Sequence, residues 1–424
     1  MRYLIKPSSV SGNIRVPPSK SHTLRALVFA LMADGESKIR HYLGSPDTIA
    51  MIEAIKKFGA QVEMDEDVIY VQGVGGRLKR PDDVIDAGNS GLVFRLISAI
   101  AALGDSYVVV TGDESIRTRR PIKPLLNALT AQNIFAESMT PDGKGAVIIK
   151  GPIKAGCFSL GGQDSQPVSS LLIATSFLQG PSEIYVIEPG ERPWIDLTLS
   201  WLSKFGIEIV NADYRYYGVS GGAKISPFDV EICGDFSTAA YLIAAAIVTK
   251  SVLTIEGLDM SDVQGDKIII DHLIKMGVKI EYSLFEQSLR VDGRGEFSGM
   301  EIDINDCVDA LPILAVIACF AKTATKIVGG RICRMKESDR IAAITNGLSR
   351  MGANIEEGID GVVVYPSPLY GACLYSFKDH RIAMSLIVAA LGATGNSEVD
   401  GVEYIAKTYP TFYCDFLTIG ASIE

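Results

Sequence analysis

Acidic and basic side chains lie close together in several segments of the C-terminal half of the chain. The segments DALP, MKESDR, KDHRIAM and AKTYP contribute Asp309, Lys336, Glu337, Arg340, His380, Arg381 and Lys407. An arginine can hold a carboxylate or a phosphate through two parallel hydrogen bonds. A carboxylate among several cations stays ionised and is available as a general base. These residue types together predict a site that binds anions and transfers protons.

A second group of polar residues lies in the N-terminal half. SKSHTLRA, GNSGLVFR and GDESIRTRRPI contribute Lys20, Ser21, Arg25, Asn89, Gly91, Arg95, Arg117, Arg119 and Arg120. The chain as a whole has a formal net charge of −10, which disfavours nucleic acids and membrane surfaces as partners. Local groups of basic side chains must therefore hold any anionic ligand, and we expect small-molecule substrates.

Each of these residues also has a purely structural interpretation. A single arginine can be a surface charge, Asp309 or His380 can cap a helix, and ESDR is typical of a helix start. Residues 218–222 match the GxSxG pattern of a nucleophile turn, but no apolar helix follows, so a simple turn is predicted. No pair of histidines has the spacing of metal ligands, and no metal is expected. Only the joint pattern favours a functional site.

The elements that must position these residues form a repeat. A helix-to-strand junction, such as KFGAQVE at Lys57, recurs six times at intervals of about seventy residues. Its third residue is Asn133 in one copy and glycine in the others, namely Gly59, Gly206, Gly277, Gly352 and Gly420. Glycine and asparagine tolerate the left-handed conformation that commonly ends a helix. Each repeat therefore contains an amphipathic helix that leads into a strand.

A second series of segments interleaves with these junctions. Almost wholly apolar stretches follow starts of small, polar or charged residues at Ser19, Gly88, Asp164, Gly234, Asp306 and Lys378. A helix that is apolar on all sides is buried. The N-terminus of a helix exposes N–H groups and the positive end of its dipole, which suits anions. We predict that the six buried helices direct their N-termini at one cleft between two similar domains.

Six repeats divide into two domains of three, because 424 residues are too many for one ordinary core. We predict an α/β (α+β) fold with one domain at residues 14–222 and the other at residues 1–13 and 223–424. The seven cysteines form no CxxC pair, which indicates a reducing compartment. The N-terminal sequence MRYLIKPSS lacks the apolar core of a signal peptide. We therefore expect a cytoplasmic protein, and a monomer.

Taken in order, the motifs resemble the family of 3-phosphoshikimate 1-carboxyvinyltransferases, or EPSP synthases, which are enolpyruvyl transferases. The resemblance runs from Pro17 to Pro410 and includes PPSKSHTLRA, GNSG, GDESIRTRRPI, DALP, MKESDR, DHRIAM and AKTYP. It implies two domains of three βαβαββ units that close over an active-site cleft. It also implies transfer of the enolpyruvyl group of phosphoenolpyruvate to the 5-hydroxyl of 3-phosphoshikimate, with release of phosphate. This step of the shikimate pathway leads to chorismate and aromatic amino acids, and the chemistry needs no metal or organic cofactor.

The resemblance further implies a role for each matching residue. Asp309 would accept the proton of the attacking hydroxyl. Glu337, supported by His380, would share with Lys20 the proton at the methylene carbon. The residues implied for phosphoenolpyruvate are Lys20, Asn89, Gly91, Arg120, Gln166, Arg340, Arg381 and Lys407. Those implied for 3-phosphoshikimate are Lys20, Ser21, Arg25, Ser165, Gln166, Asp309 and Lys336.

The acceptor half departs from the family pattern. Asp164 and Glu191 stand where serines are usual, Trp194 replaces a tyrosine, and Ile332 replaces an asparagine. A carboxylate facing a phosphate in a dry site would be repelled, so we expect Arg192 or Arg117 to neutralise the two acids. The alternatives are an enolpyruvyl transferase with a different acceptor alcohol, or a catalytically silent anion-binding relative.

Overall fold

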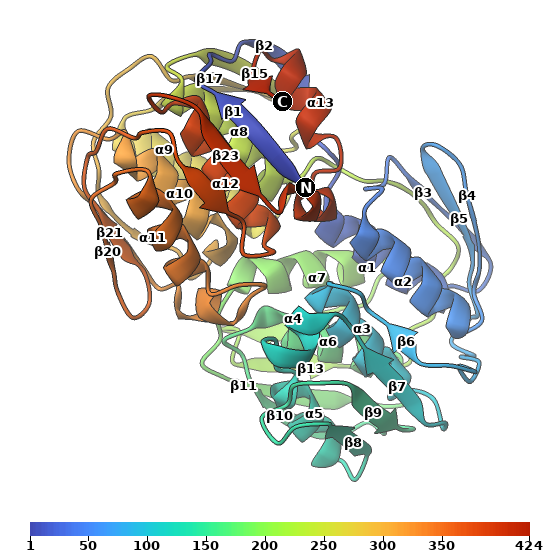
Figure 1. The fold of residues 1–424 in the computed structure, drawn as a ribbon. Helices are drawn as coiled ribbons and strands as arrows, with labels where there is room; N and C mark the ends of the chain where they lie inside the picture. The colour runs from blue at the N-terminus through green and yellow to red at the C-terminus, as the bar shows by residue number, and fades with distance from the viewer. The chain divides into compact units, whose positions relative to one another are not determined.

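The computed structural model describes all residues from 1 to 424, which form two compact units. One unit comprises residues 18–232, and the other comprises residues 1–17 and 233–424 (Figure 1). The sequence placed these boundaries earlier, after residues 13 and 222. The structure places them later because β2 (Gly12–Arg15) pairs with β15 (Val252–Glu256), and β14 (Asp229–Glu231) pairs with β3 (Glu36–Arg40).

The unit of residues 18–232 has three buried helices and three four-stranded sheets. Its buried helices are α1 (Lys20–Met32), α3 (Gly91–Ala101) and α6 (Ser165–Ser176), and the others are α2 (Pro46–Lys57), α4 (Glu114–Thr118), α5 (Lys123–Thr130) and α7 (Arg192–Lys204). The first sheet has the order β14-β3-β5-β4, with β5 at Val68–Gln72 and β4 at Gln61–Met64. The second is β6 (Ile85–Asp86), β7 (Val108–Thr111), β9 (Val147–Lys150) and β8 (Phe135–Ser138). The third is β10 (Cys157–Gly161), β11 (Ser182–Ile187), β13 (Tyr216–Val219) and β12 (Ile209–Ala212).

The other unit repeats this plan. Its buried helices are α8 (Phe236–Val248), α10 (Leu311–Cys319) and α12 (His380–Leu391), and the others are α9 (Ile268–Met276), α11 (Arg340–Arg350) and α13 (Phe412–Thr418). Short 3-10 helices are η1 (Gly265–Lys267), η2 (Val308–Ala310), η3 (Arg331–Met335) and η4 (Val402–Lys407). One sheet has the order β16 (Lys279–Ser283), β17 (Ser288–Asp292), β15 and β2. The second sheet is β18 (Glu301–Asp303), β19 (Thr325–Val328), β21 (Val362–Val364) and β20 (Ile355–Glu357). The third is β22 (Cys373–Tyr375), β23 (Ser397–Asp400), β1 (Arg2–Lys6) and β24 (Ser422–Ile423).

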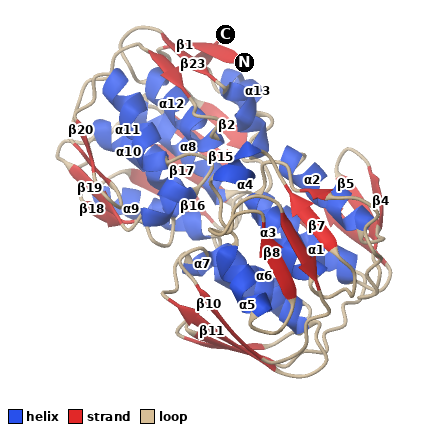
Figure 2. Ribbon diagram, turned by 60° about the horizontal axis from the view of Figure 1, so that its bottom comes forward, coloured by secondary structure: helices blue, strands red, loops and turns tan.

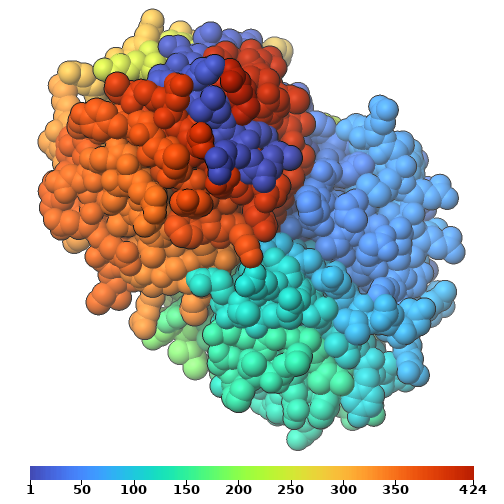
Figure 3. All heavy atoms as spheres, viewed as in Figure 1, coloured from blue at the N-terminus to red at the C-terminus, as the bar shows by residue number.

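All six sheets share one topology, which confirms the predicted repeat. In the sheet that begins with β10, β10 and β11 run parallel, whereas β13 is antiparallel to both β11 and β12. With α6 and α7 between the strands, the chain order is βαβαββ. The N-terminal strand β1 completes the sheet of the last repeat, where it pairs with β23 and β24. In Figure 3 the dark blue N-terminal residues accordingly lie among the red C-terminal ones.

The helix ends follow the prediction from the junction residues. Asn133 has a φ of 60°, and the five junction glycines also have positive φ, from 71° at Gly206 to 105° at Gly59. An L-residue other than asparagine or aspartate would be strained in this conformation. The GxSxG segment leaves β13 at Val219 and continues as a loop with no helix after it, in which Gly221 and Gly222 have positive φ.

The apolar helices form the interior of each unit (Figure 2). Every residue of α8 is buried, and α8, α10 and α12 contact one another. In the other unit α3 contacts α1 and α6. Burial of these side chains supplies the main stabilisation of both units. None of the helices combines the length and the apolar composition that crossing a bilayer requires.

Candidate functional site

Arg340 is the centre of a buried ionic network in the unit of residues 1–17 and 233–424. It is the first residue of α11, whose start is capped by Asp339 as ESDR predicted. The guanidinium is almost completely buried and donates to three carboxylates: Nε to Asp379 Oδ2 at 2.9 Å, Nη1 to Asp309 Oδ1 at 2.6 Å, and Nη2 to Glu337 Oε2 at 2.9 Å. Its planar array of donors lets one arginine hold three acids in fixed positions.

Asp309 lies in η2, just before α10, and does not cap that helix. The N-terminus of α10 has no side-chain cap. Instead, the Asp309 carboxylate also accepts Arg381 Nη2 at 2.7 Å, and 24% of its side chain is exposed. Burial by itself raises the pKa of Asp309, but Arg381, Arg340 and Lys336 outweigh burial and hold that pKa well below its usual range. Asp309 is therefore an ionised carboxylate that can reach a ligand.

Glu337 connects Arg340 with a second cation. Lys407, in η4, donates to Glu337 Oε1 at 2.5 Å, and both side chains are buried. Sequence positions 337 and 407 thus meet although they lie on different repeats. An anionic ligand that drew Lys407 or Arg340 away would change the charge balance at Glu337.

The start of α12 adds a residue that the sequence interpretation missed. Asp379 caps α12 by accepting the N–H of Arg381 at 2.9 Å, and it also accepts the Ser338 hydroxyl at 3.0 Å and Arg340 Nε. His380 is the first residue of α12 and is buried, so the capping interpretation of His380 was wrong. The sequence signal for Asp379 was its position as an acid directly before His380 in KDHRIAM. In the structure this acid orients the arginines.

In the unit of residues 18–232, a group of polar residues surrounds the start of α3. Arg120 Nη1 donates to the carbonyl of Asn89 at 3.0 Å, and Arg95 Nη1 donates to Gln166 Oε1 at 3.2 Å. Gly91 begins α3 at this point. A Cβ atom there would lie 2.2 Å from Arg120 Nη2, so only glycine leaves room for this arginine.

The start of α6 already carries two carboxylates of the chain itself. Asp164 caps α6 and pairs with Arg95 at 3.0 Å. Glu191 is buried with a left-handed φ of 47°, and its Oε2 accepts the Ser165 N–H at 2.9 Å and the Ser165 hydroxyl at 3.1 Å. Carboxylates therefore use hydrogen-bond donors that would suit a phosphate.

The expected neutralisation of Asp164 by Arg192 or Arg117 was wrong, since Arg95 is its arginine partner. Arg192 instead lies over the ring of Tyr214 at 5.8 Å, and Arg117 donates to the carbonyl of Gly112. The sequence distance of about seventy residues between positions 95 and 164 hid this pair, which the packing of α3 against α6 creates.

Lys20 and Arg25 lie on α1 and differ in their partners. Lys20 Nζ is 3.5 Å from Asp47 Oδ2. Arg25 is buried and donates to neutral oxygens, namely Thr198 Oγ1 at 3.0 Å and the carbonyls of Ser21 at 3.1 Å and Trp194 at 3.2 Å. Burial lowers the pKa of Arg25 to about 9, which still leaves it protonated at neutral pH. An anion would stabilise this charge.

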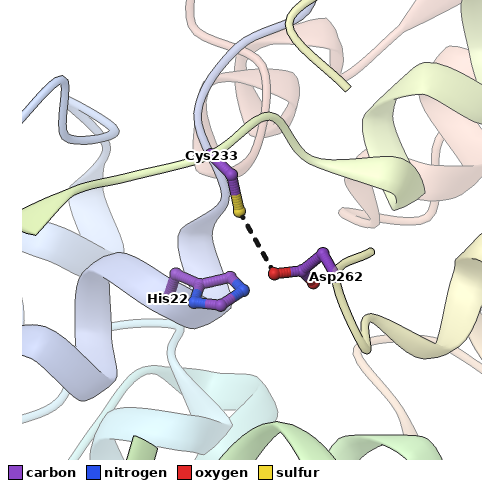
Figure 4. Close-up of side chains that lie close together, drawn as sticks. All are labelled: His22, Cys233 and Asp262. Carbon is purple, nitrogen blue, oxygen red and sulfur yellow. Dashed lines mark hydrogen bonds between the residues drawn. The ribbon is translucent and has the colours of Figure 1, made fainter. Parts of the chain in front are cut away.

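Ile332 and Cys233 make contacts that give them structural roles. Ile332 packs against the core of its unit, so the departure at this position removes a polar group. Cys233 Sγ lies 3.5 Å from Asp262 Oδ2 (Figure 4), and Gln264 Nε2 donates to the carbonyl of Gly234 at 2.9 Å. These contacts fix the loop that leads to η1. All seven cysteines are free thiols.

Comparisons with known proteins give one consistent result. A sequence model of the family described as EPSP synthase (3-phosphoshikimate 1-carboxyvinyltransferase) matches residues 4–416. The 3-phosphoshikimate 1-carboxyvinyltransferase of Acetivibrio thermocellus is 40% identical and the alignment covers 100% of this chain and 99% of that protein. Its counterpart from Chlamydia pneumoniae is 41% identical over 100% of this chain and 95% of that protein. The structure is similar to that of the EPSP synthase from Acinetobacter baumannii, with a TM-score of 0.84 and 26% identity over 100% and 99% of the two chains.

Proposed function

Because the chain belongs to the EPSP synthase family, we infer that it transfers the enolpyruvyl group of phosphoenolpyruvate to the 5-hydroxyl of 3-phosphoshikimate, with release of phosphate. The reaction is a step of the shikimate pathway to chorismate and the aromatic amino acids. The observation that best supports this chemistry is the Arg340 network, in which Asp309, Glu337 and Asp379 share one guanidinium.

We assign the binding of phosphoenolpyruvate to cations and hydrogen-bond donors of both units. The proposed set is Lys20, Asn89, Gly91, Arg120, Gln166, Arg340, Arg381 and Lys407. Arg340, Arg381 and Lys407 hold carboxylates of the chain in this structure. An incoming carboxylate or phosphate would take over some of these charge-assisted hydrogen bonds, which are the strong ones in proteins.

We assign the proton transfers to the acids of the network. The hydroxyl oxygen attacks C2 of phosphoenolpyruvate while its proton passes to Asp309, and C3 gains a proton from the group formed by Glu337 and Lys20. The tetrahedral intermediate then loses phosphate as C3 returns the proton. Substrate anions that neutralise Arg340 and Arg381 would raise the pKa of Asp309 towards the range of a useful general base. His380 is proposed to support Glu337.

We assign the acceptor to the start of α1 and α6, with Lys20, Ser21, Arg25, Ser165, Gln166, Asp309 and Lys336 as its contacts. Arg25 supports this assignment because it is a buried cation whose three hydrogen bonds reach neutral oxygens. Glu191 opposes it in its present position, since its carboxylate holds Ser165. The acceptor phosphate would therefore displace Glu191 from Ser165, or bind beside it.

We further propose that the bound substrates exclude water from the reacting groups, which strengthens electrostatic interactions. The protein is proposed to act in the cytoplasm, and as a monomer. The free thiols and the acidic composition support the compartment.

The test is a phosphate-release assay with purified protein, phosphoenolpyruvate and one acceptor at a time. We expect release with 3-phosphoshikimate, and a product whose mass equals the acceptor plus the enolpyruvyl group. Shikimate without the phosphate and a UDP-sugar serve as matched acceptors, and both should react far more slowly. A higher kcat/KM with either of them would contradict the proposed acceptor, and no release with any acceptor would indicate a silent relative.

A further inference from the structure

Asp266 is a buried carboxyl group that the proposed reaction does not use. It lies in η1, ahead of α9, and is 1% exposed. Neither carboxylate oxygen has a hydrogen-bond partner of normal geometry. The nearest cation is Arg381, whose Nη1 lies 4.0 Å from Asp266 Oδ2 while its Nη2 is bound to Asp309 Oδ2 at 2.7 Å. Arg381 is thus placed between two carboxylates and is hydrogen-bonded to one of them.

The surroundings of Asp266 set its charge. The pKa of Asp266 is raised to about 7, chiefly by burial. The charges of Asp309 in η2 and Asp235 at the start of α8 raise this pKa further, whereas Arg381 in α12 lowers it. The Ser237 hydroxyl on α8 favours the ionised form of Asp266, although neither Asp266 oxygen accepts a hydrogen bond of normal geometry. Tyr241 on α8, also near Arg381, stays neutral because burial raises its pKa to about 12. Burial and the neighbouring acids therefore favour the protonated form of Asp266, whereas Arg381 favours its ionised form.

We propose that Asp266 is a positioning residue whose ionised carboxylate competes with phosphoenolpyruvate for Arg381. This inference rests on the proposed function, in which Arg381 binds phosphoenolpyruvate. When Asp266 is protonated, Asp309 alone of these two acids competes with the substrate for Arg381. When Asp266 is ionised, a movement of about 1 Å would bring Arg381 Nη1 into hydrogen-bonding distance of Asp266 and away from the substrate.

The test compares phosphoenolpyruvate binding of the wild-type protein and Asp266→Asn between pH 6 and 8.5, by calorimetry and by KM. Asparagine has the shape of the protonated acid and cannot ionise. We expect the two proteins to have equal Kd values at pH 6. At pH 8.5 the wild-type Kd should be about threefold to tenfold higher than that of the variant. The ratio of the two Kd values cancels the titration of the substrate phosphate itself. Asp306→Asn is the matched control, because Asp306 also has a buried carboxylate oxygen without a hydrogen bond, and its ratio should stay constant with pH.

A ratio for Asp266→Asn that does not change with pH would overturn the proposal, since a purely structural role affects all pH values alike. If this variant does not fold, Ser237→Ala provides the test. Loss of the hydroxyl that favours the ionised form should move the change in phosphoenolpyruvate affinity to higher pH. An unmoved transition contradicts the inference. Phosphate release at pH 6.5 is measured first, so that failure of the proposed function is seen separately as absence of turnover.

Discussion

The replacement of Asp309 by asparagine tests the assignment of the general base. The carboxylate accepts Arg340 Nη1 at 2.6 Å and Arg381 Nη2 at 2.7 Å. The amide of asparagine keeps one oxygen for Arg340 but turns an NH2 group towards Arg381. The variant thus loses one charge-assisted hydrogen bond and the proton acceptor, while the volume of the side chain stays the same.

The expected magnitudes follow from these two losses. One charge-assisted hydrogen bond is worth about 1.5–3 kcal/mol, which a domain with an unfolding free energy of roughly 5–15 kcal/mol survives. Loss of a general base lowers kcat by about 10²–10⁴-fold, or about 3–5 kcal/mol in activation free energy. The KM for phosphoenolpyruvate should stay the same or fall, because Arg381 is no longer held by a competing carboxylate.

The assay is steady-state phosphate release at varied phosphoenolpyruvate and saturating 3-phosphoshikimate, with urea unfolding of the same preparations. Asp306→Asn is the matched control, since it makes the same change in the loop before η2 and should leave kcat within about twofold. A kcat for Asp309→Asn within tenfold of wild type, in a folded protein, would refute the general-base assignment. A raised KM with unchanged kcat would show that Asp309 only positions the arginines.

Three further predictions concern the network and the altered acceptor half. Arg340→Ala should lower the free energy of unfolding by about 3–5 kcal/mol in urea unfolding because buried carboxylates lose their partner, and a loss below 1 kcal/mol would contradict the network. Glu191→Ser should lower the KM for 3-phosphoshikimate about fivefold by freeing the Ser165 N–H, whereas an unchanged KM in the release assay would place the acceptor elsewhere. For Asp266, the raised folded pKa means that the wild-type protein loses stability as the pH rises from about 4 to about 7. The free energy of unfolding of Asp266→Asn minus that of the wild type should therefore increase by up to roughly 4 kcal/mol from pH 4 to pH 8, as measured by urea unfolding. A difference that does not change with pH would be inconsistent with that pKa.

The repeat architecture could be derived from the sequence because its signals are local. Burial of a whole helix requires apolar residues on every side, and α8 shows this in its composition. A helix end in the left-handed conformation requires glycine or asparagine, and Asn133 fits this rule with its positive φ. Periodicity and conformational preference act over a few residues, so the sequence alone determined the elements and the six-fold repeat.

The partners of the charged residues were decided by the tertiary structure. No sequence pattern connects Asp379 with Arg340, Lys407 with Glu337, or Asp164 with Arg95, since each pair joins two repeats. The left-handed Glu191 could not be expected to hold Ser165 either. Ionic partners are selected by distance and burial after the helices have packed, and these quantities depend on contacts between residues far apart in the chain. The candidates for chemistry were therefore visible in the sequence, whereas their pairing, their protonation and the competition for Arg381 arise only when the repeats are folded together.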